Sequence, residues 1–287
     1  MANNTHPSGL VEIHVAVLLF GLAGLFGKFL VIPAWLIVLG RTGYATLALG
    51  LVLIISNDRH WPKDGRTLAL FSLLGLLLAI HWITFFHSIQ VSSVAIGLLA
   101  FSTFPVFTAL IEPWWFNERR RTIDMVTAFL VFVGLVIMVY PAPFGGAVFS
   151  GAMWGTASGF TFAILSLLNR KWVRAYPSVT IAFLQNATAT IILLPMTLWI
   201  DVAVNAQQLG LLAILGIVCT ALSHALFIRG LAFARAQLAS IIACLEPVYG
   251  IVFAYLLLGE HPGLHTLAGG GIILVTTFLA MLQRVRV

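Results

Sequence analysis

The chain consists of long apolar runs separated by short polar connections. Ten runs can be distinguished, each of about twenty residues, which is the length of an α-helix that crosses the hydrocarbon core of a bilayer. The runs are continuous and do not alternate apolar with polar residues, so the pattern predicts helices and not the strands of a membrane barrel. The expected helices cover residues 11–31, 34–55, 67–88, 92–115, 123–140, 150–169, 178–200, 208–228, 236–258 and 264–282.

The composition places these helices in a membrane. Of the 287 residues, 61% are hydrophobic and only 8% are charged, with a mean hydropathy of +1.06. Soluble domains carry about 25% charged residues. The net charge of +6 fits basic cytoplasmic loops better than a nucleic-acid partner. Cys219 and Cys244 fall inside apolar runs, far from any His or Cys cluster, and predict neither a disulfide framework nor a metal site.

The basic residues predict the orientation of the chain. If the N-terminus lies in the cytoplasm, thirteen of the fifteen Lys and Arg residues fall on the cytoplasmic side, and the opposite connections hold none. Basic loops stay in the cytoplasm, so the bias predicts a multi-pass protein of the bacterial inner membrane with both termini inside. Lys28 and Arg41 lie within or beside the apolar runs. The thirteen are Arg59, Lys63, Arg66, Arg119, Arg120, Arg121, Arg170, Lys171, Arg174, Arg229, Arg235, Arg284 and Arg286.

The chain also repeats itself at an offset of 142 residues, which aligns Pro105 with Pro247 and Glu118 with Glu260. Each half holds five apolar runs. Because five is odd, the two halves must insert in opposite directions, as in the inverted repeats of many secondary transporters. The two glutamates are expected to fix a helix-to-helix turn in each repeat. The expected repeats are residues 1–145 and 146–287.

Two stretches of the chain carry a family resemblance. They read "FFHSIQVSSVAIGLLAFSTFPVFTALIE" and "LAFARAQLASIIACLEPVYGIVFAYLLLGE". Both are similar to the EamA domains of the drug/metabolite transporter superfamily, and the resemblance covers essentially the whole chain. Within the superfamily the sequence looks most like the YddG-type exporters of aromatic amino acids. The resemblance implies ten helices, with spans 1–4 and 6–9 around a central cavity and spans 5 and 10 outside it as supports.

The motifs point to transport and away from catalysis. The sequence has no nucleophile elbow, no HExxH helix and no P-loop. It is therefore not expected to be an enzyme, and no cofactor or metal is expected. Without a nucleotide-binding site in the chain, transport is expected to run on a gradient or by facilitated diffusion. A membrane-embedded enzyme or receptor subunit is an alternative, but the short connections argue against it.

The third apolar run holds the first candidates for substrate binding. Polar groups in a bilayer are costly and tend to face a cavity or a partner. His81 could bind a substrate head group, and Trp82 could stack on an apolar or aromatic substrate. The repeat offset places Ser223 and His224 opposite them, so the two pairs are expected in the outer and inner halves of the bundle. The alternative is that each His makes an interhelical hydrogen bond.

Further candidates lie in three other runs. Gln185 and Asn186 stand in an apolar helix, where an amide can donate to and accept from an amino-acid head group. Trp154 and Ser158 share one helix face, although Trp154 lies near a span end and an interfacial anchor is an equal alternative. Tyr44 is a further candidate. Interhelical hydrogen bonding is the alternative for the two amides.

The charged residues and prolines inside the runs each allow more than one interpretation. Glu246 could couple protons or meet a substrate amine, or it could be structural. Arg41 could be its long-range partner, a membrane-edge charge or a counter-charge to a substrate carboxylate. Pro105 and Pro247 each remove a backbone donor in mid-span, which predicts a kink that acts either as a hinge or as a static bend.

These features predict an inner-membrane permease that exports small metabolites by alternating access. Aromatic or large apolar amino acids are the expected substrates. A multidrug exporter of lipophilic cations coupled to protons is the alternative, and it would make Glu246 essential. The expected partners are a small-molecule substrate and the lipid bilayer. The glycine-rich face at Gly269–Gly271 is expected to allow close helix packing, and it could also mediate a homodimer.

Overall fold

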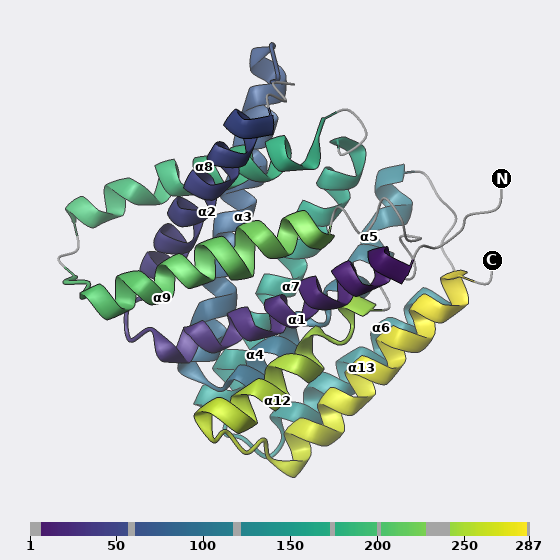
Figure 1. Ribbon diagram of the computed structural model, residues 1–287. Helices are drawn as coiled ribbons and strands as arrows, with labels where there is room; N and C mark the ends of the chain where they lie inside the picture. Colours follow the sequence, from purple (N-terminus) through teal and green to yellow (C-terminus); the bar gives the residue numbers. More distant parts are fainter. Residues whose placement is uncertain are drawn as a thin grey trace.

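The chain is described by a computed structural model that covers residues 7–56, 61–116, 122–172, 176–199, 202–227 and 242–285. These residues form helices joined by short turns, which confirms the predicted all-helical class (Figure 1). Glu118, Arg59, Arg119–Arg121, Arg174, Arg229, Arg235 and Arg286 lie outside the described residues, so their expected roles stay predictions.

The helices follow the predicted apolar runs closely. The first half contains α1 (Pro7–Phe29), α2 (Ala34–Ser56), α3 (Gly65–Val91), α4 (Val94–Phe101), α5 (Phe104–Phe116) and α6 (Thr122–Val139). The second half contains α7 (Ala147–Trp172), α8 (Ser178–Leu193), a 3₁₀ turn (Leu194–Leu198), α9 (Ala206–Gly216), a π-helical segment (Ile217–Leu222), α12 (Glu246–Leu258) and α13 (Leu264–Val285).

Eight helical stretches of the described residues are long and apolar enough to cross a membrane. Two shorter apolar helices, Glu246–Leu258 and Leu264–Ala280, follow them. The ninth predicted span begins at residue 236, and its first residues lie outside the described ranges. Ten membrane crossings therefore stay a prediction. The eight stretches are 9–29, 34–56, 65–91, 94–115, 122–139, 147–169, 179–198 and 206–227.

Side chains in the connections start several of the helices. Asp64 caps α3 by accepting a hydrogen bond from the Thr67 amide at 2.8 Å, and this bond lowers the pKa of the Asp64 carboxyl. Ser93 caps α4 in the same way. Asn205 and Gln208 form a reciprocal capping box at the start of α9. The polar residues between the runs thus fix where the spans begin.

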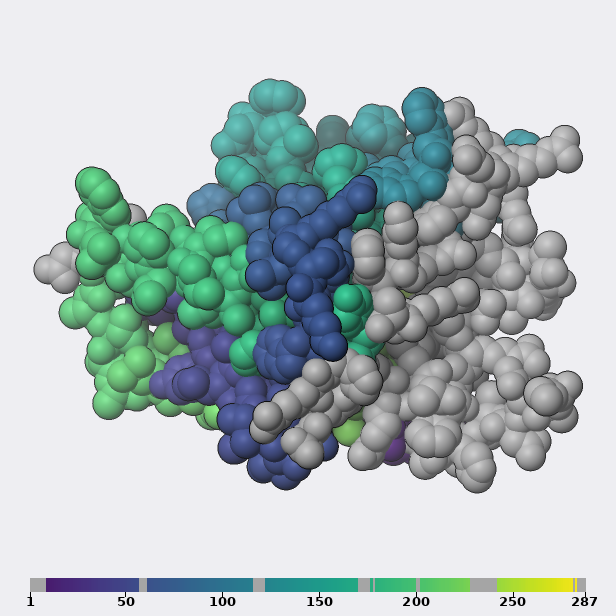
Figure 2. All heavy atoms as spheres, turned by 90° about the horizontal axis from the view of Figure 1, so that it is seen from above, coloured from purple at the N-terminus to yellow at the C-terminus, as the bar shows by residue number. Residues whose placement is uncertain are grey.

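The two halves interleave. α3 packs against α4 and α2 of its own half and against α7 and α8 of the other half. α1 lies along α12, α2 contacts α8 and α9, and α6 pairs with α13 at one side of the bundle (Figure 1). Seen from above, the green second-half helices lie beside the blue first-half helices (Figure 2). Large apolar side chains such as Leu47, Ile54 and Phe132 remain exposed, as a lipid-facing surface requires.

The fourth and ninth predicted spans are each interrupted just before the proline, and the role of both prolines as a hinge or a static bend stays a prediction. α4 ends at Phe101, and α5 begins at Phe104, so Pro105 lies in the first turn of a new helix. Pro247 is likewise the second residue of α12. The first turn of a helix tolerates proline because its N–H groups have no partner within the helix. Each proline therefore marks a helix start.

Glycines set the closest contacts between helices. A Cβ added at Gly21 of α1 would lie 2.8 Å from the Glu246 carbonyl oxygen, at the start of α12. A Cβ at Gly159 of α7 would lie 2.9 Å from the Phe101 carbonyl oxygen, at the end of α4. Both glycines thus allow a neighbouring helix to pack directly on a break.

The glycine-rich face of α13 packs against neighbouring helices inside the molecule, which confirms the expected packing role. Gly269 packs on the backbone of α6 at Gly134 and Met138, and Gly270 packs on Leu99 of α4. Only Gly271 of the three has open space around its Cα. A homodimer remains a prediction, but two of the three glycines are not free to form it.

Lys28 and Glu260 tie together three helix connections at one end of the bundle. Lys28 Nζ, at the end of α1, donates a 2.8 Å hydrogen bond to the Ser92 carbonyl after α3. The Glu260 carboxylate, after α12, accepts a 2.9 Å hydrogen bond from the Val94 amide at the start of α4. Glu260 therefore holds a helix-to-helix connection, although the connection is the one between α3 and α4 and not its own turn.

Candidate functional site

Arg41 of α2 is buried at the centre of a polar and aromatic cluster. Its Nε–H donates a 2.7 Å hydrogen bond to Thr220 Oγ1 of the π-helical segment. Its guanidinium carbon lies 3.8 Å from the centre of the Trp82 ring and 5.7 Å from that of Phe86. A guanidinium over an aromatic face is favourable, more so away from water. The guanidinium is thus held by both halves of the chain.

The local structure of the second half is shaped to receive this arginine. Thr220 Oγ1–H donates to the Leu215 carbonyl at 2.8 Å, five residues earlier, in the wider turn of the π-helix. A Cβ at Gly216 would lie 2.7 Å from the Arg41 carbonyl oxygen, so only glycine allows this approach of α9 to α2. Such π-bulges inside α-helices are frequent at functional sites.

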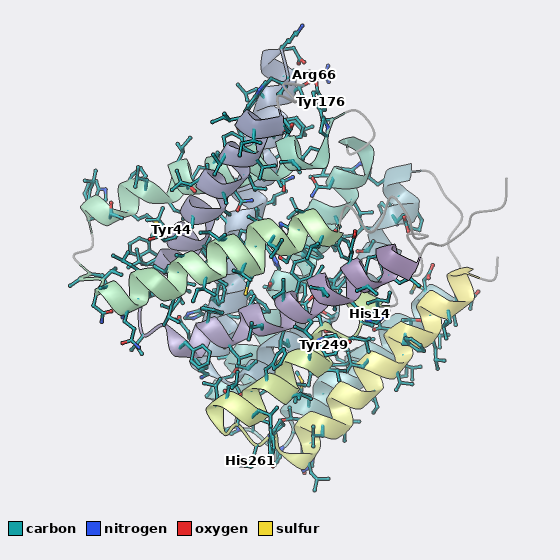
Figure 3. The ribbon with its side chains drawn as sticks, in the orientation of Figure 1. His14, Tyr44, Arg66, Tyr176, Tyr249 and His261 are labelled. Atoms are coloured by element: carbon teal, nitrogen blue, oxygen red, sulfur yellow. The ribbon has the colours of Figure 1, made fainter. Side chains whose placement is uncertain are left out.

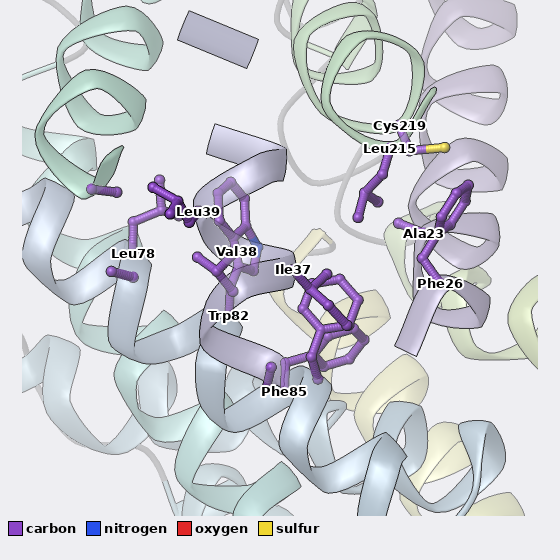
Figure 4. Close-up of a cluster of buried hydrophobic side chains, with 14 of the residues drawn as sticks. Ala23, Phe26, Ile37, Val38, Leu39, Leu78, Trp82, Phe85, Leu215 and Cys219 are labelled. Carbon is purple, nitrogen blue, oxygen red and sulfur yellow. The ribbon is translucent and has the colours of Figure 1, made fainter. Parts of the chain in front are cut away.

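Trp82 and His224 come together across the two halves. Their rings stack with centroids 6.4 Å apart. This contact joins a residue of each candidate pair across the two halves of the chain, and the expected placement of the pairs in the outer and inner halves of the bundle stays a prediction. Trp82 is buried against α2 (Figure 4), and its ring supports Arg41. Ser223 is turned to its own helix and donates to the Cys219 carbonyl.

His81 bridges α3 and α7. Its Nδ1 lies 2.8 Å from Ser158 Oγ, and Ser158 Oγ–H is also 3.0 Å from the His81 carbonyl oxygen. Phe101 and Phe162 lie against the imidazole, with ring centroids 5.3 and 4.9 Å away. The geometry therefore matches the alternative in which His81 makes an interhelical hydrogen bond, and Ser158 is its partner.

Glu246 is the first residue of α12 and is half-buried. Its charge lies within interaction range of Arg41, yet the described residues contain no direct ion pair between the two. No described side chain or backbone amide donates a hydrogen bond to its carboxylate. The site thus brings opposite charges near one another without joining them.

The two amides of α8 are occupied with structural contacts. Gln185 Nε2 donates to Asn169 Oδ1 of α7 at 2.6 Å, and Asn186 Nδ2 donates to the Ala182 carbonyl at 2.8 Å. The Asn186 Oδ1 atom is buried without a hydrogen-bond partner in the described part of the chain. No contact in that part joins either amide to Arg41. Their substrate-binding role stays a prediction that this geometry does not strengthen.

Tyr44 and Trp154 lie at the margin of the cluster. Tyr44 is half-buried where α2 crosses α9 (Figure 3), close to Gly216. Trp154 is 43% exposed and packs edge-to-face on His87, with centroids 5.1 Å apart. This position near a span end matches the interfacial alternative for Trp154.

Thr220, Phe20 and Phe227 were not predicted from the sequence. Phe20 of α1 lies 5.4 Å from His224 and 6.0 Å from Phe227, measured between ring centroids. These rings extend the aromatic surface beside Trp82. The available signal for Thr220 was a hydroxyl residue in an apolar run, three residues before Ser223. Phe20 and Phe227 give no such signal, because phenylalanine is ordinary in an apolar run. Within the described ranges, no group of three His, Cys, Asp or Glu could hold a metal ion.

Comparison with known proteins shows similarity to one family of transporters. The model of the EamA-like transporter family matches residues 7–140 and again 149–282. The uncharacterized transporter YxxF of Bacillus subtilis is 25% identical over 99% of this chain and 93% of its own length. The uncharacterized inner membrane transporter YicL of Salmonella typhimurium is 25% identical over 96% of this chain and 95% of its own.

Two further matches add detail. A protein named as the S-adenosylmethionine uptake transporter of Rickettsia conorii is 24% identical over 71% of this chain and 69% of its own length. A solved crystal structure superposes with a TM-score of 0.68 at 16% identity and covers 98% of both chains. At that identity the match describes the fold alone. The names of these relatives give no support for the YddG-type aromatic exporters in particular.

Proposed function

Because the chain belongs to the EamA-like transporter family, a family of transporters and not of enzymes, we propose that it carries a small metabolite across the membrane by alternating access. The single observation that supports this best is that both halves of the chain contribute residues to the central site. Arg41 and Trp82 come from the first half, and Thr220, His224 and Glu246 come from the second. A site shared by two repeats can open to either side when one repeat moves against the other.

The contacts between the halves support the inverted repeat, with units 1–145 and 146–287 and ten spans. In α3, Gly75 packs on the Gln185 carbonyl of α8, and in α9, Gly216 packs on the Arg41 carbonyl of α2. In the repeat, α3 of the first half corresponds to α9 of the second, and α2 corresponds to α8. The contact of α3 with α8 is therefore equivalent to the contact of α9 with α2. Gly21 and Gly159, which pack on the two breaks, form another such pair of contacts.

The proposed substrates are amino acids with aromatic or large apolar side chains, and the proposed direction is export. Aromatic rings surround the central charges, which suits an apolar side chain. The S-adenosylmethionine named for the Rickettsia protein also contains an α-amino acid group, although that protein is named for uptake. The one-sided distribution of basic residues supports an inner-membrane location with both termini in the cytoplasm.

The alternative substrate is a lipophilic cation exchanged for protons. The half-buried Glu246 is the observation in its favour, because a lone intramembrane carboxylate can bind a cation or a proton in turn. Arg41 argues against it, since a buried positive charge in the same cluster repels a substrate that carries only positive charge.

Transport into liposomes tests the proposal. Purified protein is reconstituted, and the flux of labelled phenylalanine, tryptophan, leucine, glutamate and a lipophilic cation is measured with and without a pH gradient. We expect the aromatic and large apolar amino acids to move well above the rate of protein-free liposomes. Equal rates with and without protein for all amino acids would contradict the proposal. Movement of the cation alone, driven by the pH gradient, would establish the alternative. Efflux from inverted membrane vesicles against right-side-out vesicles then decides the direction.

A further inference from the structure

We infer that Arg41 and Glu246 bind the two ends of a zwitterionic head group, with Thr220 as the residue that positions Arg41. The inference rests on the transport proposed above and assigns the residues that recognise the substrate class. Arg41 would bind the carboxylate, and Glu246 would bind the ammonium group. Both roles were among the alternatives that the sequence left open for these two residues.

The contacts of Arg41 leave its carboxylate-binding end free. Its Nε–H is used by Thr220, and its flat face lies on Trp82. The terminal Nη groups make no hydrogen bond to the described residues, and no described carboxylate forms an ion pair with them. A buried guanidinium without a counter-ion is costly, and two parallel N–H···O bonds to a carboxylate are the pairing that its shape favours.

Glu246 offers the complementary charge. It is the first residue of α12, is half-buried and interacts electrostatically with Arg41 without forming an ion pair with it in the described part of the chain. Two opposite charges that are not paired with one another can each bind one end of a ligand that carries both charges. An amine would pair with Glu246 but would be repelled by Arg41, and a carboxylic acid would pair with Arg41 but would be repelled by Glu246. The arrangement therefore favours α-amino acids over amines and over acids.

Aromatic rings continue from the Trp82 ring that supports Arg41. His224 stacks on Trp82, and Phe20 and Phe227 continue the surface. Phe20, His224 and Phe227 are each half-buried, so their rings are accessible in part, whereas Trp82 is buried. We assign the substrate side chain to these three rings and leave Trp82 as the platform for the guanidinium.

Thr220 fixes where the guanidinium points. Its hydroxyl is fully buried, accepts from Arg41 Nε–H and donates to the Leu215 carbonyl. This chain of two hydrogen bonds ties the arginine of the first repeat to the π-helical segment of the second. Loss of the hydroxyl would release the guanidinium from its orientation while keeping its charge. The predicted consequence is weaker binding of the carboxylate and not a loss of the fold.

The test compares three labelled solutes in liposomes that contain the whole protein: L-phenylalanine, phenethylamine, which lacks the carboxylate, and N-acetyl-L-phenylalanine, which lacks the positive charge. We expect the unmodified protein to prefer phenylalanine over each analogue by about 10- to 100-fold in kcat/KM, as expected for one charge-assisted contact. Arg41→Gln should abolish the preference over phenethylamine, and Glu246→Gln should abolish the preference over the acetylated solute. Arg66→Gln, at an exposed position of α3, serves as the control and should keep both preferences.

Thr220 variants separate positioning from folding. Thr220→Val should raise KM for phenylalanine by about tenfold and change kcat less, and Thr220→Ser should restore the value. Folding of every variant is checked by size-exclusion chromatography in detergent. If phenylalanine moves but both analogues move equally well, the head-group assignment is wrong and the transport proposal stands. If none of the three solutes moves, the proposed substrate class is wrong, and the inference falls with it. If Thr220→Ser behaves as Thr220→Val, the positioning role is wrong.

Discussion

The two helix breaks of the molecule share the same backbone arrangement, an interrupted helix just before a proline, but they differ in the side chains that they carry. The first separates α4 from α5 at Ser102 and Thr103, and the second precedes α12 at Cys244 and Leu245. Both come just before a proline, and both have a glycine of another helix packed on them. The first is neutral, whereas the second exposes Glu246. A repeated fold can thus carry a structural feature in one half and a functional candidate in the other.

The first break is satisfied by its own side chains. Ser102 Oγ–H donates to the Leu98 carbonyl, and Thr103 Oγ1–H donates to the Ala100 carbonyl, both at 2.8 Å. Phe101 and Phe104 stack over the same turn with ring centroids 5.2 Å apart, and Phe162 of α7 closes it. Hydroxyls and rings therefore seal this break against a polar ligand.

The second break carries a different set of groups. Leu245 precedes α12 without a side-chain cap, and the Leu245 amide bonds only to the Ile242 carbonyl. Glu246 stands in the first turn of α12, where the helix dipole favours a negative charge. This favourable position explains how a carboxylate is retained in the middle of the bundle.

The largest expected effect comes from filling the space at both breaks. Gly159→Ala and Gly21→Ala each place a Cβ within 2.9 Å of backbone oxygen atoms, which cannot move without shifting a helix. We expect each to lower the free energy of unfolding by about 1–3 kcal/mol. The measurement is thermal and chemical unfolding in detergent. If only one of the two is destabilising, the breaks are not equivalent in packing.

Gly271→Ala is the matched control for these two variants. It lies in α13 and has no atom within 4 Å of the added Cβ. Alanine is favoured over glycine inside a helix by about 0.5–1 kcal/mol, so this variant should be slightly more stable than the unmodified protein. A Gly21→Ala variant as stable as Gly271→Ala would refute the close approach of α1 to α12.

An intermediate effect is expected beside the first break. Ser158→Ala removes the two hydrogen bonds that the Ser158 hydroxyl makes to His81, whereas the contact of His81 Nδ1 with the Ser158 backbone carbonyl at 3.1 Å remains. We expect a loss of about 0.5–1.5 kcal/mol in the free energy of unfolding, the usual net contribution of a hydrogen bond. Thr161→Val on the same helix removes only bonds to its own helix and should cost less. A double-mutant cycle with His81→Ala measures the coupling. No coupling between the two sites would leave His81 free for a substrate-binding role.

The smallest effect is expected from the prolines themselves. Pro105→Ala and Pro247→Ala should each change the free energy of unfolding by less than about 1 kcal/mol, because a first-turn proline costs the helix nothing. A proline in a helix interior would instead destabilise by about 3 kcal/mol. A gain of that size in either variant would show that the helix continues through the break. The measurement is unfolding in denaturant, in which the midpoints of the variants and the unmodified protein are compared at the same dependence of the free energy of unfolding on denaturant concentration.

The amino-acid sequence by itself determined the membrane class, the helix positions and the family. Each of these depends on composition within one segment, since the length and polarity of a run decide whether it enters a bilayer. The candidate residues His81, Trp82, His224, Arg41 and Glu246 were also found, because an isolated polar group in an apolar run is visible without its partners. Their roles were not determined, and the structure shows that His81 contacts Ser158 and that Trp82 contacts Arg41.

Only the tertiary structure decided which groups meet. Arg41 bonds to Thr220, which is 179 residues away in the chain, and Trp82 stacks on His224. Such contacts depend on where two helices cross and on how each is rotated, and the crossing is set by small residues such as Gly216 and by the π-helical turn after it. No pattern within one helix encodes the rotation of its neighbour. The sequence could therefore point to the charges, but their separation across two repeats emerged only from packing.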